Sequence, residues 1–166
     1  MRGHLVTGAE REAGVRQWLL TSLPGADRPD AAADWETRGV TVLPTGTLFS
    51  AVRLPADVAA KAAGSTDWAA IDRYLSSALD GPVICTREGG AYVALVPPSA
   101  ARTWSVSGVV FLGRGSVVAV PAPGLVRDHS PGAYWSVPME SPGVLCLADD
   151  VAHVATRGLQ WGGDRV

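Results

Sequence analysis

Apolar residues recur at helical spacing in the first half of the chain and again near its end. The capping-box sequence Thr7-Gly8-Ala9-Glu10 precedes one apolar stripe and predicts a helix to about Leu20. A second stripe begins at Trp68, which we expect in the core, and predicts a helix capped by Ser65 or Thr66. Shorter helices are expected at 29–37, 55–64 and 149–156.

Short β-branched runs alternate with glycine and proline turns over the rest of the chain, as strands do. These runs cover 40–43, 48–54, 83–86, 92–96, 109–112, 117–120 and 134–137. Gly89-Gly90 predicts a hairpin between the third and fourth runs, and Gly113-Arg114-Gly115-Ser116 predicts a second hairpin between the fifth and sixth. Helices followed by hairpins predict an α+β fold with a mostly antiparallel sheet and flanking helices.

Length and composition indicate one folded domain. The chain has 166 residues, of which 47% are hydrophobic and 18% are charged, so disorder is excluded as its main state. We expect a single domain over 1–157 and a flexible tail over 158–166. The net charge of −2 excludes a strong overall attraction to nucleic acid.

The start of the chain and its two cysteines bear on the cellular compartment. Met1 to Glu10 lacks the apolar stretch of a signal peptide, and no apolar run approaches the length of a membrane span. Cys85 and Cys146 lie in apolar runs, which favours buried free thiols over a disulfide. We therefore expect a cytoplasmic protein that does not interact with a membrane.

Three segments share a pattern with a known family. They are 40–46 with the strand that follows, 86–92 leading to Pro97-Pro98, and 109–123 followed by Gly132-Ala133-Tyr134-Trp135. In this order they resemble the Thr-Gly turn, the Gly-Gly hairpin and the closing element in the N-terminal domain of bifunctional DNA primase/polymerases, a branch of the archaeo-eukaryotic primase superfamily. The resemblance implies a cleft that binds a nucleotide.

The side chains that the family's chemistry needs are missing from this chain. The resemblance implies two carboxylates, one residue apart on the first strand, that hold divalent metals for a nucleoside triphosphate. Leu48 to Leu54 contains no carboxylate and carries Arg53 instead. Tyr92 stands where the family has a nucleotide-contacting His, and Val110 stands near its third acid. We therefore expect no metal, no cofactor and no two-metal phosphoryl transfer.

Other residue patterns offer weaker candidates. The 113–116 turn can grip an anion through its backbone N–H groups and Arg114, although such turns more often only connect strands. Arg127 and His129 lie in a proline- and glycine-rich loop, where binding residues are common. The acidic residues near 149 have metal-ligand spacing with His153, but the start of a helix explains them more simply.

Taken with the resemblance, these patterns predict a non-catalytic domain that binds a nucleotide or nucleic acid through a degenerate cleft. The expected ligand-binding residues are Arg53, Tyr92, Arg114, Arg127 and His129. One alternative is a protein–protein or regulatory module whose cleft is filled by Phe49, Tyr92 and Val110. Another is an enzyme with a new site around 127–135. The resemblance also predicts that the strands of Arg53, Tyr92 and Val110 lie side by side in one sheet.

Overall fold

Helices and strands account for most of the described chain, which comprises residues 7–87, 90–127 and 132–163 of a computed structural model, with side chains described to residue 160. The helices are α1 (Gly8–Leu20), α2 (Arg28–Arg38), α3 (Ala56–Ala63), α4 (Trp68–Leu79) and α5 (Ala148–Gly163). Short 3-10 helices cover Gly25–Asp27 and Pro98–Arg102. The strands are β1 (Val40–Pro44), β2 (Ser50–Pro55), β3 (Val83–Thr86), β4 (Ala91–Val96), β5 (Val110–Leu112), β6 (Val117–Pro121) and β7 (Tyr134–Val137).

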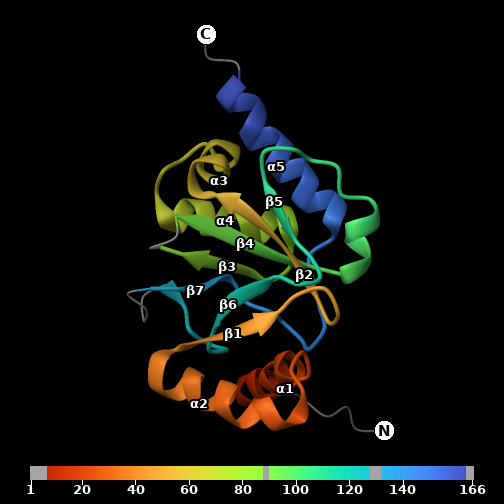
Figure 1. Cartoon of the computed structure of the whole chain (residues 1–166). Coiled ribbons are helices and arrows are strands. Elements are labelled where there is room, and N and C mark those ends of the chain that lie inside the picture. Colours follow the sequence, from red (N-terminus) through yellow and green to blue (C-terminus); the bar gives the residue numbers. More distant parts are fainter. Residues whose placement is uncertain (1–6, 88–89, 128–131, 164–166) are drawn as a thin grey trace, which may run out of the picture.

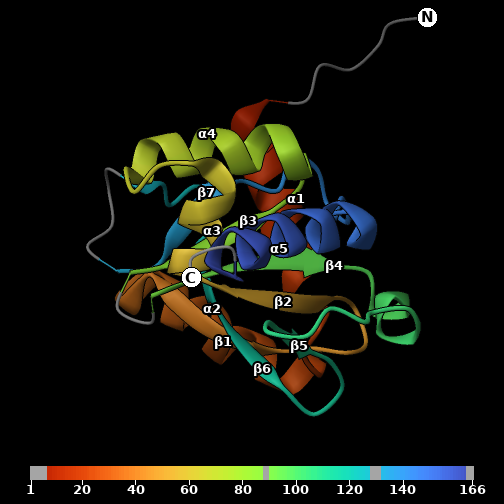
Figure 2. The same ribbon diagram turned by 90° about the horizontal axis from the view of Figure 1, so that it is seen from above.

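The strands form two antiparallel sheets, which confirms the predicted α+β fold. Five strands lie in the order β5-β2-β4-β3-β7, and β1 pairs with β6 in a separate two-stranded ribbon. Helices α3, α4 and α5 cover one face of the large sheet, whereas the ribbon, backed by α1 and α2, covers the other (Figures 1 and 2). Among the described residues, no helix is long and apolar enough to cross a bilayer.

Two hydrophobic cores lie on opposite faces of the large sheet because side chains alternate along each strand. Leu54 and Tyr92 pack into the core under α3, α4 and α5. Ala51 and Val93 pack into the core that faces α1 and α2. The Trp35 indole of α2 donates to the carbonyl of Val120 at 2.9 Å and so attaches this helix to the ribbon.

The 113–116 turn joins two sheets, so the predicted hairpin between 109–112 and 117–120 is wrong. β5 pairs with β2, whereas β6 pairs with β1. The turn instead packs against Thr45-Gly46: the Thr45 amide donates to Ser116 O at 3.0 Å, and its hydroxyl donates to Gly113 O at 2.6 Å. Gly46 has a φ of +102°, which only glycine adopts without strain.

Local signals near helix ends are partly confirmed. The capping box at Thr7 forms both of its hydrogen bonds, and β3 and β4 form the predicted hairpin. Asp67 caps α4, not Ser65 or Thr66. The expected tail over 158–166 begins too early, because α5 continues to Gly163 and Gly158 packs directly against Val58 of α3.

Candidate functional site

Arg53, Tyr92 and Val110 lie on adjacent strands, as expected, but they do not share one face of the sheet. Arg53 is paired with Val93 of β4 and with Val110 of β5, whereas Tyr92 is paired with Leu54. Directly paired residues of antiparallel strands point to the same side. The Tyr92 side chain is therefore on the helix-covered face, fully buried, while Arg53 is exposed on the other face.

Two adjacent hollows meet at Arg53 and Val110, and we call them together the Arg53 groove. One, of about 320 Å³, lies between the large sheet and β6. The other, of about 280 Å³, continues past the ends of β2 and β4. Their described lining side chains other than Arg53 are uncharged, namely Pro55, Thr86, Gly90, Ala91, Val93, Gly108, Val109, Val110, Leu112, Val117, Val118 and Ala119.

The other expected site residues are spread over the molecule. Arg114 is exposed in the turn over Gly46 and is not among the residues that line the Arg53 groove. His129 lies outside the described residues. Phe49 is fully buried in the core that faces α1 and α2 and Tyr92 in the opposite one, so the expected cleft filled by Phe49, Tyr92 and Val110 is wrong.

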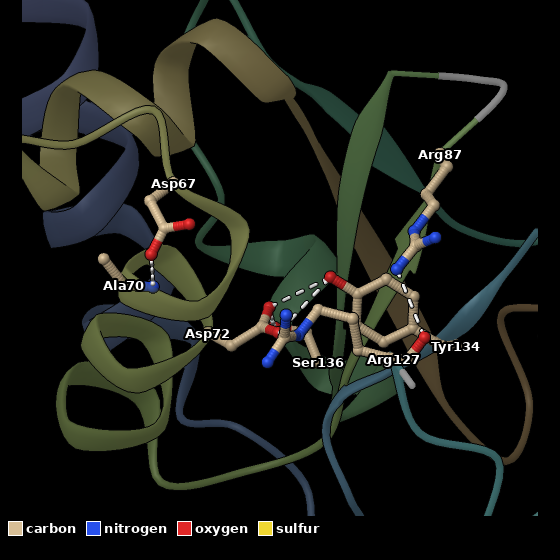
Figure 3. A network of polar contacts seen from close by, with 7 residues as sticks. All are labelled: Asp67, Ala70, Asp72, Arg87, Arg127, Tyr134 and Ser136. Atoms are coloured by element: carbon tan, nitrogen blue, oxygen red, sulfur yellow. Dashed lines mark hydrogen bonds and ion pairs between the residues drawn. The ribbon is translucent and has the colours of Figure 1, made fainter. Parts of the chain in front are cut away.

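A polar cluster around Asp72 brings Arg127 together with residues that the sequence reasoning missed (Figure 3). The Ser136 hydroxyl donates to Asp72 Oδ1 at 2.6 Å, and the Tyr134 hydroxyl lies 3.3 Å from both carboxylate oxygens. Arg127 Nε lies 3.6 Å from Asp72 Oδ2. One carboxylate of α4 therefore connects β7 with the segment that precedes it.

The environment of Asp72 opposes its ionisation despite these partners. Its side chain is only 16% exposed. Burial raises the pKa of Asp72 above its usual 3.8, although hydrogen bonds from Ser136 and Tyr134 and the charges of Arg127 and Arg87 act in the opposite direction. The cluster thus holds a partly desolvated carboxylate beside two guanidinium groups.

Arg87 is positioned by aromatic rings. Its guanidinium carbon lies 5.1 Å from the centre of the Tyr134 ring and 6.0 Å from that of Trp68. One terminal nitrogen donates to Arg127 O at 3.2 Å (Figure 3). Trp68 was expected in the core, but it is 36% exposed because it lies in the first turn of α4, at the edge of the packed face.

A pocket of about 230 Å³ between α3 and α4 adjoins this cluster. It is lined by Ala56, Asp57, Ala60, Thr66, Trp68, Ile71 and Tyr92. The Trp68 and Tyr92 ring centres are 6.0 Å apart. Burial raises the pKa of Tyr92, of Tyr134 and of the Cys85 thiol above their ordinary values of 10.0, 10.0 and 9.0, so all three are neutral at pH 7.

Sequence signals for the Asp72 cluster were present but weak. Asp72 follows the buried Ile71 in α4, where an acidic residue normally points to solvent, and Arg87 lies in the 86–92 segment, whose glycines predict only a hairpin. No group of three His, Cys, Asp or Glu side chains suited to a metal ion occurs among the described residues.

Known proteins were compared with this chain at three levels. No family model, no curated protein and no solved structure matches it.

Proposed function

We propose that this chain is a non-catalytic binding module that holds a nucleotide or a single-stranded nucleic acid in the Arg53 groove. The proposal rests on one observation above all: Arg53 is an exposed guanidinium where two hollows meet, and their other described lining side chains are uncharged. The proposal includes the cytoplasmic location expected from the sequence.

The chemistry of the groove suits a phosphate-bearing ligand. Arginine keeps its charge at any physiological pH and forms two parallel hydrogen bonds to a phosphate. Arg53 stands on the strand where the primase/polymerase resemblance implies metal-holding carboxylates, so its guanidinium would supply the positive charge that metals supply there. The valine-lined walls, including Val110 and Val117, can pack against sugar and base.

Fluorescence anisotropy at low salt tests the proposal with two probes, a labelled oligothymidylate and a labelled adenine nucleotide. Replacing Arg53 by Ala should weaken binding by about 1–3 kcal/mol, the range for a hydrogen bond to a charged group. Arg102→Ala is the matched control, since Arg102 is an exposed arginine that follows the opposite end of β4. Because Arg53 is exposed, its attraction to a phosphate is screened by salt, and affinity should fall as salt is added.

The proposal fails if the wild-type protein binds neither probe at millimolar concentration. It also fails if Arg53→Ala and Arg102→Ala weaken binding equally, because the effect would then come from overall charge.

A protein-interaction module is the second candidate, because exposed apolar side chains lie on β1 and β6 of the ribbon and on β5 of the large sheet. Val42, Val110 and Val117 are 55%, 55% and 58% exposed. Contiguous apolar surface on a folded protein often marks an interface. Sedimentation velocity over a range of concentrations tests whether the protein associates with a second copy, and Val117→Ser is compared with wild type. This candidate is favoured if wild type associates, the substitution abolishes the association, and neither probe binds.

A further inference from the structure

Three features meet at Trp68, on the face of the sheet opposite the Arg53 groove. Trp68 is a wall of the 230 Å³ pocket between α3 and α4. Its ring is partly exposed and lies against Tyr92. The guanidinium of Arg87 lies 6.0 Å from the ring centre. The Trp68 ring therefore lines an open apolar pocket and also lies beside the guanidinium of Arg87.

Arg87 has hydrogen-bonding capacity that the described chain does not use. Its Nε is buried and has no hydrogen-bond partner among the described residues, although a terminal nitrogen donates to Arg127 O. A buried donor without an acceptor is costly and rare in folded proteins. The guanidinium also lies 6.0 Å from the ring centre of Trp68 and 5.1 Å from that of Tyr134, so little ordering remains to be done when an acceptor arrives.

Both carboxylates described near the pocket have cationic partners. Asp72 is the carboxylate whose charge acts on both Arg87 and Arg127 within the described cluster, and burial opposes its ionisation. Asp57, which lines the pocket, is paired with Lys61 of the same helix at 3.8 Å. The acidic group that lines the pocket is thus paired within its own helix.

The size and lining of the pocket restrict its occupant. A volume of 230 Å³ is smaller than the roughly 300–1,000 Å³ of sites for drug-sized ligands, so one flat ring system fits. Ala56 and Ala60 of α3 leave the space open, and Trp68 and Tyr92 offer ring surfaces for stacking.

We propose that this pocket binds a small aromatic anion, with the ring against Trp68 and the anionic group on Arg87. A nucleoside monophosphate and an aromatic carboxylate share this chemistry. The inference does not depend on the function proposed for the Arg53 groove, because the two sites lie on opposite faces of the sheet and use different arginines.

Titration calorimetry with two probes, adenosine monophosphate and indole-3-acetate, tests the proposal and separates the two sources. Arg87→Ala should weaken binding of the preferred probe about tenfold or more, as expected when one charge-assisted hydrogen bond is lost. Ala60→Leu should have a similar effect, since the larger side chain fills the pocket while leaving every charge in place. Arg87→Lys, which keeps the charge but loses the planar stacking, should lie between wild type and Arg87→Ala.

Arg102→Ala is the control and should leave the affinity within about twofold, because distant sites behave independently. Arg53→Ala removes only the part of the adenosine monophosphate signal that comes from the Arg53 groove, and the effects of Arg87→Ala and Ala60→Leu should persist in that background. Thermal melting checks that each variant folds; if Arg87→Ala does not, Ala60→Leu and Arg87→Lys still decide the matter. The proposal is overturned if neither probe binds at millimolar concentration, or if Ala60→Leu binds as wild type does. Binding that Arg53→Ala abolishes and Ala60→Leu spares would overturn this site and support the Arg53 groove instead.

Discussion

The contact between Gly46 and the 113–116 turn allows a sharp test of how this fold is held together. Gly46 has a φ of +102°, and a Cβ there would lie 2.5 Å from the backbone nitrogen of Arg114. Replacing Gly46 by Ala therefore imposes both backbone strain and a collision with main-chain atoms, which cannot rotate away as a side chain can.

The cost follows from the two contributions. A non-glycine residue held in a sparsely populated backbone region costs about 1–3 kcal/mol. Relieving the collision separates the two turns and disturbs both hydrogen bonds of Thr45, each worth about 0.5–1.5 kcal/mol. We expect Gly46→Ala to lower the free energy of unfolding by about 2–6 kcal/mol.

Gly115→Ala is the matched control. Gly115 has a similar φ of +92°, but a Cβ there meets no atom within 4 Å. It should therefore show the strain alone, and both substitutions restrict the unfolded chain equally. Urea denaturation followed by tryptophan fluorescence gives both free energies. Equal losses in the two variants would refute the claim that the turn–turn contact stabilises the fold.

Further predictions concern the buried polar groups. Asp72→Ala should lower the free energy of unfolding, measured by urea denaturation, by about 1–3 kcal/mol, because the hydroxyls of Ser136 and Tyr134 lose their acceptor. Asp72→Asn retains an acceptor and should lower it by less. Because burial raises the pKa of Asp72, the folded protein binds the proton of this carboxyl more tightly than the unfolded chain does. The resulting stabilisation is complete below the ordinary pKa of 3.8 and is lost as pH rises through the raised pKa. The free energies of unfolding of wild type and Asp72→Asn, measured at several pH values, should therefore differ in their pH dependence over this range. Cys85 and Cys146 should not react with a thiol reagent until the protein unfolds, since both are fully buried and burial raises the pKa of Cys146 to about 12. Rapid labelling of the folded protein would contradict this prediction.

Features decided within a few residues are the ones that the sequence predicts well. The capping box at Thr7 and the β3–β4 hairpin both depend on neighbours only a few positions away. The choice of Asp67 over Ser65 as the cap of α4 shows the limit of this reasoning, because several adjacent residues had suitable side chains.

Strand partners and strand faces depend on the whole fold. The 113–116 turn is typical of a hairpin, yet its two strands find partners far away in sequence, because β5 completes one sheet and β6 pairs with β1. The face of Tyr92 depends on its register opposite Leu54, and a shift by one residue would have placed it beside Arg53. The Asp72 cluster could not be predicted for the same reason, since it forms only where α4 packs against β7.

The pairing of β1 with β6 also determines when each part of the chain can fold on the ribosome. β1 ends at Pro44, but its partner strand is complete only at Pro121, so the ribbon cannot close until most of the chain has been synthesised. Helix α2 depends on that ribbon, because Trp35 donates to Val120. The β2–β4 pairing needs nothing beyond Val96. The segment of α2 and β1 thus waits for its native contacts while later segments pair, and during that interval its apolar face is available to chaperones.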